Sequence, residues 1–452
     1  YAWLIPAVMV DKWVKVTSLL CLYGFLKDFK PSEPFLTEFL IGQWKNFTEN
    51  QVNQDIYPVW TYSYLVLLPL VFLLTDLCCY KPVIVMNGLS YVITYSLLIG
   101  TSSLALMQVM QFFYSVATAT EVAYFTYLYA HVDKVHYKVV TGWSRASLLL
   151  GKFLGCVVAQ ITVHFGLLDY SSLNYLTLTS VTMAAIVVVP LPSVPSSEYF
   201  YSLDSEKSVK VETSWNTRCR VAVAKIITDV KFAYSNASVL KWSLWWAMST
   251  CGSYQIGNYV QVLWHDISPI EMNEERFNGL VFGFSTLLGA LTSLGVGYVS
   301  CPWDIYGDVI IAVLSIIQGA LVFTMAMASK LWVSYSCYVA FKIFFQMLIT
   351  ISGHQVAESI RSNSYGLIFG LNTFFALILQ TMLTLVFVDH TGIPLTVPNQ
   401  FVAYAFYFFI IGIFFLLSSL VLFMRNKCSR PKPENIEVEA EAEKLNQALP
   451  SG

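Results

Sequence analysis

The chain of 452 residues is 56% hydrophobic and 15% aromatic, only 12% of its residues are charged, and its formal net charge is −2 at pH 7. A soluble domain carries about 25% charged residues, and a mean hydropathy of +0.60 leaves too little polar surface for a protein in water. The composition excludes soluble enzymes, secreted domains and nucleic-acid-binding proteins, and it predicts an integral membrane protein.

Apolar stretches long enough to cross a bilayer recur along the chain, since one helical crossing needs about 20 apolar residues. The first six stretches are residues 13–29, 57–79, 83–100, 104–130, 143–167 and 173–191. After a polar gap, a second six follow at 239–264, 277–299, 306–328, 331–353, 364–388 and 399–424. Runs this long and this uniformly apolar predict helices rather than the strands of a membrane barrel. We therefore expect an all-α integral membrane protein with twelve transmembrane helices.

The polar gap divides the chain into two halves. The expected parts are an N-terminal six-helix bundle (1–191), a cytoplasmic linker (192–238), a C-terminal six-helix bundle (239–424) and an acidic disordered cytoplasmic tail (425–452). Two six-helix bundles joined by a long connector are the plan of the major facilitator superfamily, whose substrate site lies between the halves near the midplane. Within the linker, residues 215–235 could form a basic helix on the inner leaflet, where anionic lipid attracts Lys and Arg.

The distribution of basic residues predicts the orientation, because cytoplasmic loops carry an excess of Lys and Arg. Most basic residues fall on the side of the two termini and the linker, whereas the other side keeps few, among them Lys45, Arg276 and Lys330. We therefore expect both termini in the cytoplasm. Asn46 begins a glycosylation acceptor in the first outside loop, and a second acceptor pattern at Asn236 falls on the inside and should be unused.

Few charged side chains lie within the predicted helices, where each costs at least about 2.5 kcal/mol to insert. Glu121 lies deep in the fourth stretch, which contains no compensating Lys or Arg. This carboxylate is therefore either part of a substrate path or paired with a base on another helix. Lys152 and Lys342 lie near the middles of the fifth and tenth stretches. For these two we favour a structural role, in which either lysine neutralises a carboxylate across the bundle.

Glu33 lies between Pro31 and Pro34 at the end of the first stretch. Proline interrupts helices, and broken helices at membrane depth line cavities, so Glu33 could face a ligand; a turn in an outside loop is the equal alternative. Tyr57 and Trp60 suit a belt at the membrane interface, which composition alone favours. They also suit a binding site, because aromatic ring faces attract a cation. Carboxylates and rings together are typical of a site for a flat organic cation.

No catalytic constellation is recognisable in the sequence. The histidines show no metal-ligand spacing, and neither a phosphate-binding loop nor a nucleophile elbow is present. We expect no enzyme activity, no metal and no cofactor, so transport would depend on a gradient. The nine cysteines lie mostly in or beside apolar runs, which predicts no disulfide framework.

Several segments together resemble the reduced folate carrier and thiamine transporter family. They are residues 31–36 (PSEPFL), 58–65 (PVWTYSYL), 75–76 with 80–82 (TD and YKP), 121–124 (EVAY), 242–246 (WSLWW), 258–264 (NYVQVLW) and 369–374 (FGLNTF). The likeness runs in order from about residue 15 to 425. Folate carriers of the family have an arginine where this chain has Glu121 and a lysine where it has Gln380. This chain therefore looks like the thiamine branch.

The resemblance also implies a substrate site. It implies that Glu121 and Tyr124 bind the aminopyrimidine of thiamine, and that Tyr57 and Trp60 stack on its rings. The other residues of the implied site are Glu33, Trp143 and Asn258.

The chain departs from the thiamine-transporter pattern at two positions. Phe282 stands where thiamine transporters carry an acidic residue, three positions after the glycine of the motif at 277–279. Trp143 stands where the family has a tyrosine in the motif at 142–145, so an aromatic ring is kept and a hydroxyl is lost. A cation site has thereby lost one carboxylate.

We therefore expect a secondary transporter of the plasma membrane that imports a water-soluble vitamin, first of all thiamine, by alternating access. Its expected partners are the substrate and the lipid bilayer, without nucleic acid, and it is expected to act as a monomer. One alternative is a carrier for pyridoxine or another organic cation. The others are an organic-anion carrier of the folate kind that uses Lys152 and Lys342, and a vitamin receptor that does not transport.

Overall fold

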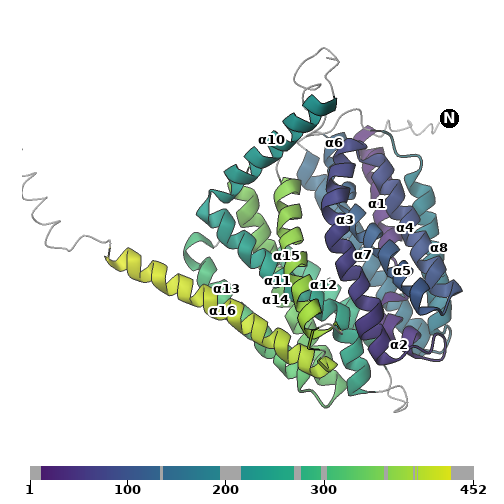
Figure 1. The fold of residues 1–452 in the computed structure, drawn as a ribbon. Coiled ribbons are helices and arrows are strands. Elements are labelled where there is room, and N and C mark those ends of the chain that lie inside the picture. Colours follow the sequence, from purple (N-terminus) through teal and green to yellow (C-terminus); the bar gives the residue numbers. More distant parts are fainter. Residues whose placement is uncertain are drawn as a thin grey trace, which may run out of the picture.

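The computed structural model describes residues 12–132, 136–193, 215–268, 276–296, 303–360, 365–389, 392–393 and 395–428. Within these ranges all regular structure is helical. The helices stand side by side in two groups, one from each half of the chain (Figure 1). The expectation of an all-α membrane protein is confirmed.

The N-terminal group contains the helices that the first six apolar stretches predict. Its elements are α1 (Lys12–Asp28), a 3-10 turn η1 (Glu33–Phe35), α2 (Leu36–Ile41), a π-helical turn η2 (Gln51–Ile56), α3 (Tyr57–Leu77), α4 (Lys81–Gly100), α5 (Leu104–Thr120), α6 (Val122–His131), α7 (Tyr137–His164) and α8 (Tyr170–Val188). The proline-flanked segment at Glu33 is a break in the helical path, as the sequence predicts. It directs the chain from α1 into the short helix α2.

The C-terminal group is preceded by a helix outside the bundle. The elements are α10 (Trp215–Tyr234), α11 (Ala237–Ile267), α12 (Asn278–Val296), α13 (Trp303–Ala326), α14 (Leu331–Ser359), α15 (Tyr365–Phe387) and α16 (Val397–Cys428). The predicted linker at 192–238 is described from Trp215 onward and in residues 192–193, and the predicted tail at 425–452 lies outside the described residues beyond Cys428.

In the described ranges, nine helices are long and apolar enough to cross a membrane. The other predicted crossings are α1, α5 together with α6, and α11. Helices α1 and α5 have only 17 residues each. Helix α11 has 31 residues, but it buries polar side chains such as Ser253 and Gln255. Length therefore sets α1 and α5 apart from the nine, and buried polar side chains set α11 apart.

The fourth predicted stretch is divided at Glu121, where α5 ends and α6 begins. The Glu121 backbone N–H donates to the Thr118 carbonyl at 3.3 Å, one residue short of the α-helical partner. The hydroxyls of Thr118 and Thr120 donate to carbonyls four residues earlier in the same helix, at 2.8 and 2.7 Å. Such bonds compete with the helical ladder and bend helices. The threonine-rich sequence before Glu121 therefore explains the break.

Close helix packing at glycines shapes the C-terminal group. A Cβ atom at Gly412 of α16 would lie 2.5 Å from Ile316 Cγ1 and 3.0 Å from the Ala312 carbonyl oxygen of α13. Small residues let helix backbones approach closely in membranes. Helices α13 and α16 therefore form a tight pair at the outside of this group.

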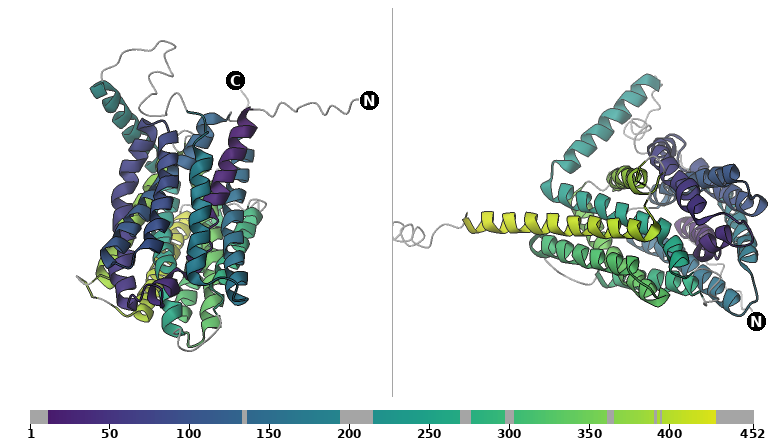
Figure 2. Two further views of the ribbon diagram at one scale, coloured as in Figure 1. Left: turned by 90° about the vertical axis from the view of Figure 1, so that its right-hand side faces the viewer. Right: turned by 60° about the horizontal axis from the view of Figure 1, so that its bottom comes forward.

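The two ends of the bundle are marked by α2 and α10, which lie at opposite ends in both side views (Figures 1 and 2). We call them the α2 end and the α10 end. At the α10 end, Ala222 and Ile226 of α10 belong to one apolar cluster with Phe72 of α3 and Leu367 of α15. Helix α10 thus touches both halves. The predicted helix at 215–235 is confirmed, and its location on the inner leaflet stays a prediction.

Candidate functional site

A cavity of about 430 Å³ lies between the two halves. The N-terminal half lines it with residues of η1, α3, α4, α5 and α7, and the C-terminal half with residues of α11, α12 and α14. Pockets of about 300 to 1,000 Å³ hold small molecules, most often where two parts of a protein meet. This cavity is therefore the candidate substrate site.

Two of the predicted aromatic residues line the cavity. Tyr57 and Trp60 are only 8% and 9% exposed, because both lie between the halves rather than against the lipid headgroups. The Trp60 indole N–H donates to Thr118 Oγ1 at 3.3 Å, and the Tyr57 hydroxyl shares a 2.7 Å hydrogen bond with Thr37 Oγ1. These bonds fix both rings at the cavity wall, which favours the binding-site interpretation over an interface belt.

Asn258 of α11 lines the cavity from the other half. Its amide nitrogen is buried and has no hydrogen-bond partner among the described residues. A buried donor without a partner costs about 1–3 kcal/mol. An acceptor on a bound ligand would remove that cost.

Glu33 lines the cavity but its charge is already compensated. The Lys30 ammonium lies 2.6 Å from Glu33 Oε1, and the Tyr114 hydroxyl donates to the same oxygen at 3.0 Å. Lys30 also lies 4.8 Å from the centre of the Tyr91 ring. The carboxylate therefore lies within a network of the N-terminal half.

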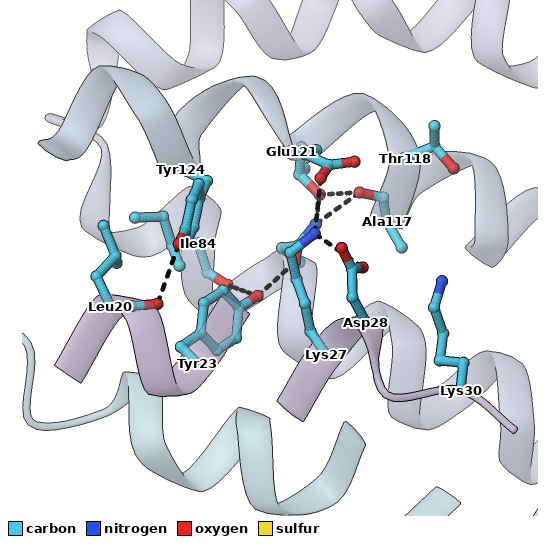
Figure 3. Close-up of polar contacts among 12 residues, drawn as sticks. Leu20, Tyr23, Lys27, Asp28, Lys30, Ile84, Ala117, Thr118, Glu121 and Tyr124 are labelled. Atoms are coloured by element: carbon cyan, nitrogen blue, oxygen red, sulfur yellow. Dashed lines mark hydrogen bonds and ion pairs between the residues drawn. The ribbon is translucent and has the colours of Figure 1, made fainter. Parts of the chain in front are cut away.

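Glu121 is paired in the same way, by a base that the sequence analysis did not assign. The Lys27 ammonium at the end of α1 lies 2.7 Å from Glu121 Oε1 and 3.4 Å from Asp28 Oδ1 (Figure 3). The structure agrees with the second interpretation of Glu121, in which a base on another helix pairs with it. Glu121 does not line the cavity, although it shares a helix face with Tyr114, which does.

Tyr124 and Trp143 lie away from the cavity. Tyr124 is 2% exposed in the core of the N-terminal half, and its hydroxyl donates to the Leu20 carbonyl at 3.2 Å. The Trp143 side chain is 46% exposed and stacks near Trp13, with ring centroids 6.2 Å apart. The cavity thus brings together four of the predicted site residues, namely Glu33, Tyr57, Trp60 and Asn258, while Glu121, Tyr124 and Trp143 stand apart from it.

Lys152 and Lys342 both line the cavity, from opposite halves. In the described ranges neither ammonium comes within ion-pair distance of a carboxylate, so the structure does not show the direct pairing that we favoured. Lys342 donates to Ser253 Oγ at 3.3 Å and lies 5.6 Å from the centre of the Tyr338 ring. Lys152 is exposed to the cavity, and its charge acts on Lys342 and on Glu33.

The cavity and its immediate surroundings hold more ammonium groups than carboxylates. The four lysines are Lys27, Lys30, Lys152 and Lys342, and the three carboxylates are Asp28, Glu33 and Glu121. When all are ionised, one positive charge is in excess. Phe282 lies at the same cavity, where it adds an aromatic face and no charge.

A second network joins the halves at the α2 end. Glu38 of α2 pairs with Arg276 at 2.7 Å and contacts the His265 ring nitrogen at 3.3 Å. The three side chains are 1%, 7% and 12% exposed, respectively. We call Glu38, His265 and Arg276 the α2-end latch. Because Glu38 belongs to the N-terminal half and its partners to the C-terminal half, the α2-end latch joins the two halves at this end.

A family model described as the reduced folate carrier matches residues 11–403. The chain belongs to the reduced folate carrier family. The chain is 39% identical to human thiamine transporter 1 over 457 residues, covering 92% of each protein. It is 37% identical to folate transporter 1 of Caenorhabditis elegans over 422 residues, covering 90% of this chain and 93% of the relative.

Solved structures show the same fold at low sequence identity. The nucleoside transporter NupG matches with a TM-score of 0.61 at 13% identity, over 89% of this chain and 99% of that one. A POT family transporter matches with a TM-score of 0.63 at 12% identity, over 90% and 96%. The expected fold of the major facilitator superfamily is confirmed. This member of the reduced folate carrier family is a transporter of the folate and thiamine group, and not an enzyme.

Proposed function

We propose that this family member takes up an anionic water-soluble vitamin of the folate kind through the central cavity. One observation carries the proposal. Lys152 and Lys342 reach the cavity without a carboxylate partner among the described residues, whereas Glu33 and Glu121 are each paired with a lysine.

The charge balance of the cavity favours an anion over a cation. Two unit charges 4 Å apart interact by about 4 kcal/mol at the effective dielectric constant of a protein surface. A carboxylate of the substrate would gain from two such ammonium groups, and hydrogen bonds to charged groups contribute about 1.5–3 kcal/mol each. A cation would have to displace Lys27 or Lys30 before it reached a carboxylate.

The rest of the cavity suits a flat ring attached to that anion. Trp60, Tyr57 and Phe282 offer aromatic faces, and the buried Asn258 amide offers a donor. Stacked aromatic pairs contribute about 0.5–1.5 kcal/mol beyond area burial. In alternating access the two halves rock about such a central site.

Thiamine is the second candidate. The contact of Glu33, Tyr57 and Trp60 with the cavity favours it, because carboxylates and aromatic faces recognise organic cations. Binding of thiamine requires the ion pair between a carboxylate and its lysine to break. Binding of pyridoxine would require the same.

Uptake of labelled folate and labelled thiamine into cells that express the chain tests the proposal. We expect saturable folate uptake above vector-transfected cells, inhibited by unlabelled folate at least tenfold more strongly than by thiamine or pyridoxine. Thiamine uptake without folate uptake would contradict it. Preloaded cells distinguish a transporter from a receptor, since only a transporter accelerates exchange with unlabelled substrate outside.

We further propose that the protein acts as a monomer in the plasma membrane, with both termini cytoplasmic and the α2 end outside. Asn46 is exposed at the α2 end, so Asn46→Gln is expected to increase gel mobility by as much as glycosidase treatment does, with uptake retained. Ser238→Ala is the matched control: it removes the acceptor pattern at Asn236 but keeps the Asn236 side-chain cap of α11, and should leave mobility unchanged. A shift with Ser238→Ala instead would reverse the orientation.

A further inference from the structure

We infer that Lys27 is a positioning residue that sets the charge specificity of transport, because it neutralises Glu121 and so makes the path favour an anion over a cation. The inference rests on the proposed function. It assigns that function's charge preference to a side chain outside the cavity.

The geometry separates Lys27 from the substrate and connects it to Glu121. The Lys27 side chain is 1% exposed, and its ammonium lies 2.7 Å from Glu121 Oε1 (Figure 3). The Glu121 side chain, in contrast, is 37% exposed although it lies at the break between α5 and α6. Lys27 therefore acts on a transported ion through carboxylate partners such as Glu121 and not by direct contact.

Glu121 follows the last residue of α5, beyond the cavity-lining part of that helix. Tyr114, Thr118 and Glu121 follow one another at spacings of four and three residues, which places them on one face of the helix. Tyr114 lines the cavity, and Thr118 accepts the hydrogen bond of the cavity residue Trp60. A substrate that moves along this face toward the α10 end passes Glu121.

Lys27 is buried, and ion pairs stabilise its positive charge. Tyr23 and Tyr124 next to it are 0% and 2% exposed, and the ammonium lies 5.9 Å from the centre of the Tyr124 ring. A buried ammonium without water needs a carboxylate partner, since an unpaired buried charge costs several kcal/mol. Lys27 has two such partners, Asp28 and Glu121.

The other charges near this cluster leave no surplus negative charge for a cation. Asp28, the second carboxylate beside Lys27, is also acted on by the charges of Lys30 and Lys152. With Lys27 present, ammonium groups outnumber carboxylates around the cavity by one. Without it the numbers are equal, and Glu121 and Asp28 have no ion-pair partner among the described residues.

The test compares Lys27→Met with Lys27→Arg, using the ratio of thiamine to folate uptake at sub-saturating concentrations. Lys27→Met is expected to raise this ratio at least about tenfold, through a lower KM for thiamine and a higher KM for folate. Lys27→Arg keeps the positive charge and should keep the ratio. A merely structural role would reduce the maximal rate for both substrates together.

Two further variants keep the test informative if Lys27→Met does not reach the cell surface. Lys27→Met combined with Glu121→Gln removes both members of the pair, so surface expression and the wild-type ratio should return. Glu121→Gln alone leaves Lys27 with one carboxylate fewer and should lower the ratio, toward folate. A ratio that none of these surface-expressed variants changes would overturn the inference.

Failure of the proposed function gives a different uptake result from failure of the inference. Wild-type cells that take up neither vitamin would refute the proposed function without any variant. Wild-type uptake of folate with a thiamine-to-folate ratio that surface-expressed Lys27→Met leaves unchanged would overturn the inference alone, because Lys27 would then not set the charge preference.

Discussion

Simultaneous replacement of Lys152 and Lys342 by glutamine is expected to reduce uptake of the anionic substrate by at least about a hundredfold. Each lysine would lose a charge-assisted hydrogen bond to the substrate, a loss of about 1.5–3 kcal/mol, and each 1.4 kcal/mol corresponds to a factor of ten. The single variants should each lose about tenfold or more. The measurement is the initial rate of folate uptake at sub-saturating concentration, divided by the amount of protein at the cell surface.

The double variant should remain folded, because neither lysine is paired with a carboxylate in the described part of the chain. Removal of an unpaired charge from within a membrane protein favours insertion rather than opposing it. Lys231→Gln is the matched control: it removes the same charge from an exposed position of α10, outside the cavity, and should leave uptake unchanged. Wild-type folate uptake by the double variant would contradict the role of both lysines.

The helices were predictable because the bilayer imposes one strong rule on sequence. Each crossing needs a long apolar run with its backbone hydrogen bonds satisfied internally, and composition alone reveals such runs. The division at Glu121 was not predicted, since hydropathy is insensitive to it. It follows from threonine hydroxyls that bond to their own helix, which the spacing of Thr118 and Thr120 permits but does not require.

The partner of Glu121 illustrates what sequence reasoning missed. A carboxylate in a span needs either a base or a ligand, and the bases that the sequence suggested across the bundle were Lys152 and Lys342 rather than Lys27. Lys27 and Asp28 stand in an otherwise apolar stretch, so they were visible as charges without an assigned partner. Which of the two contacts Glu121 depends on how α1 packs against the break between α5 and α6. Tertiary packing of this kind cannot be inferred from the sequence.

The cavity residues also divide into those that local sequence predicts and those that depend on tertiary structure. The prolines beside Glu33 predicted a broken helix at a cavity, and that local inference agrees with its place in η1. The exposure of Lys152 and Lys342 to the cavity was only one of the alternatives, because their spans predict depth in the membrane but not direction. Local sequence patterns could not place Tyr57, Trp60 and Asn258 at the cavity, because their place depends on contacts between halves that are far apart in sequence. Only the resemblance to the family indicated these three residues.

Breaking the α2-end latch is expected to shift the transporter toward the state in which the α2 end is open. Arg276→Gln leaves Glu38 buried without its ion-pair partner whenever this end is closed, and such a loss costs about 3–5 kcal/mol. In the open state Glu38 is hydrated and the cost disappears. The equilibrium should therefore move at least about a hundredfold toward the open state, and uptake should fall because closure becomes rate-limiting.

Cys156 provides the measurement, since it is 4% exposed and lines the cavity from α7. A membrane-impermeant thiol reagent should label it faster in Arg276→Gln than in the wild type, and a Cys156→Ala background should remove that signal. Glu358→Gln is the control, because Glu358 is 67% exposed and its 3.8 Å contact with His354 is a surface contact. The exchange of Glu38→Arg with Arg276→Glu should restore protection of Cys156, as the ion pair then forms with its polarity reversed. If the exchanged pair stays as reactive as Arg276→Gln while the protein reaches the surface, the attraction between the two charges is not what keeps this end closed.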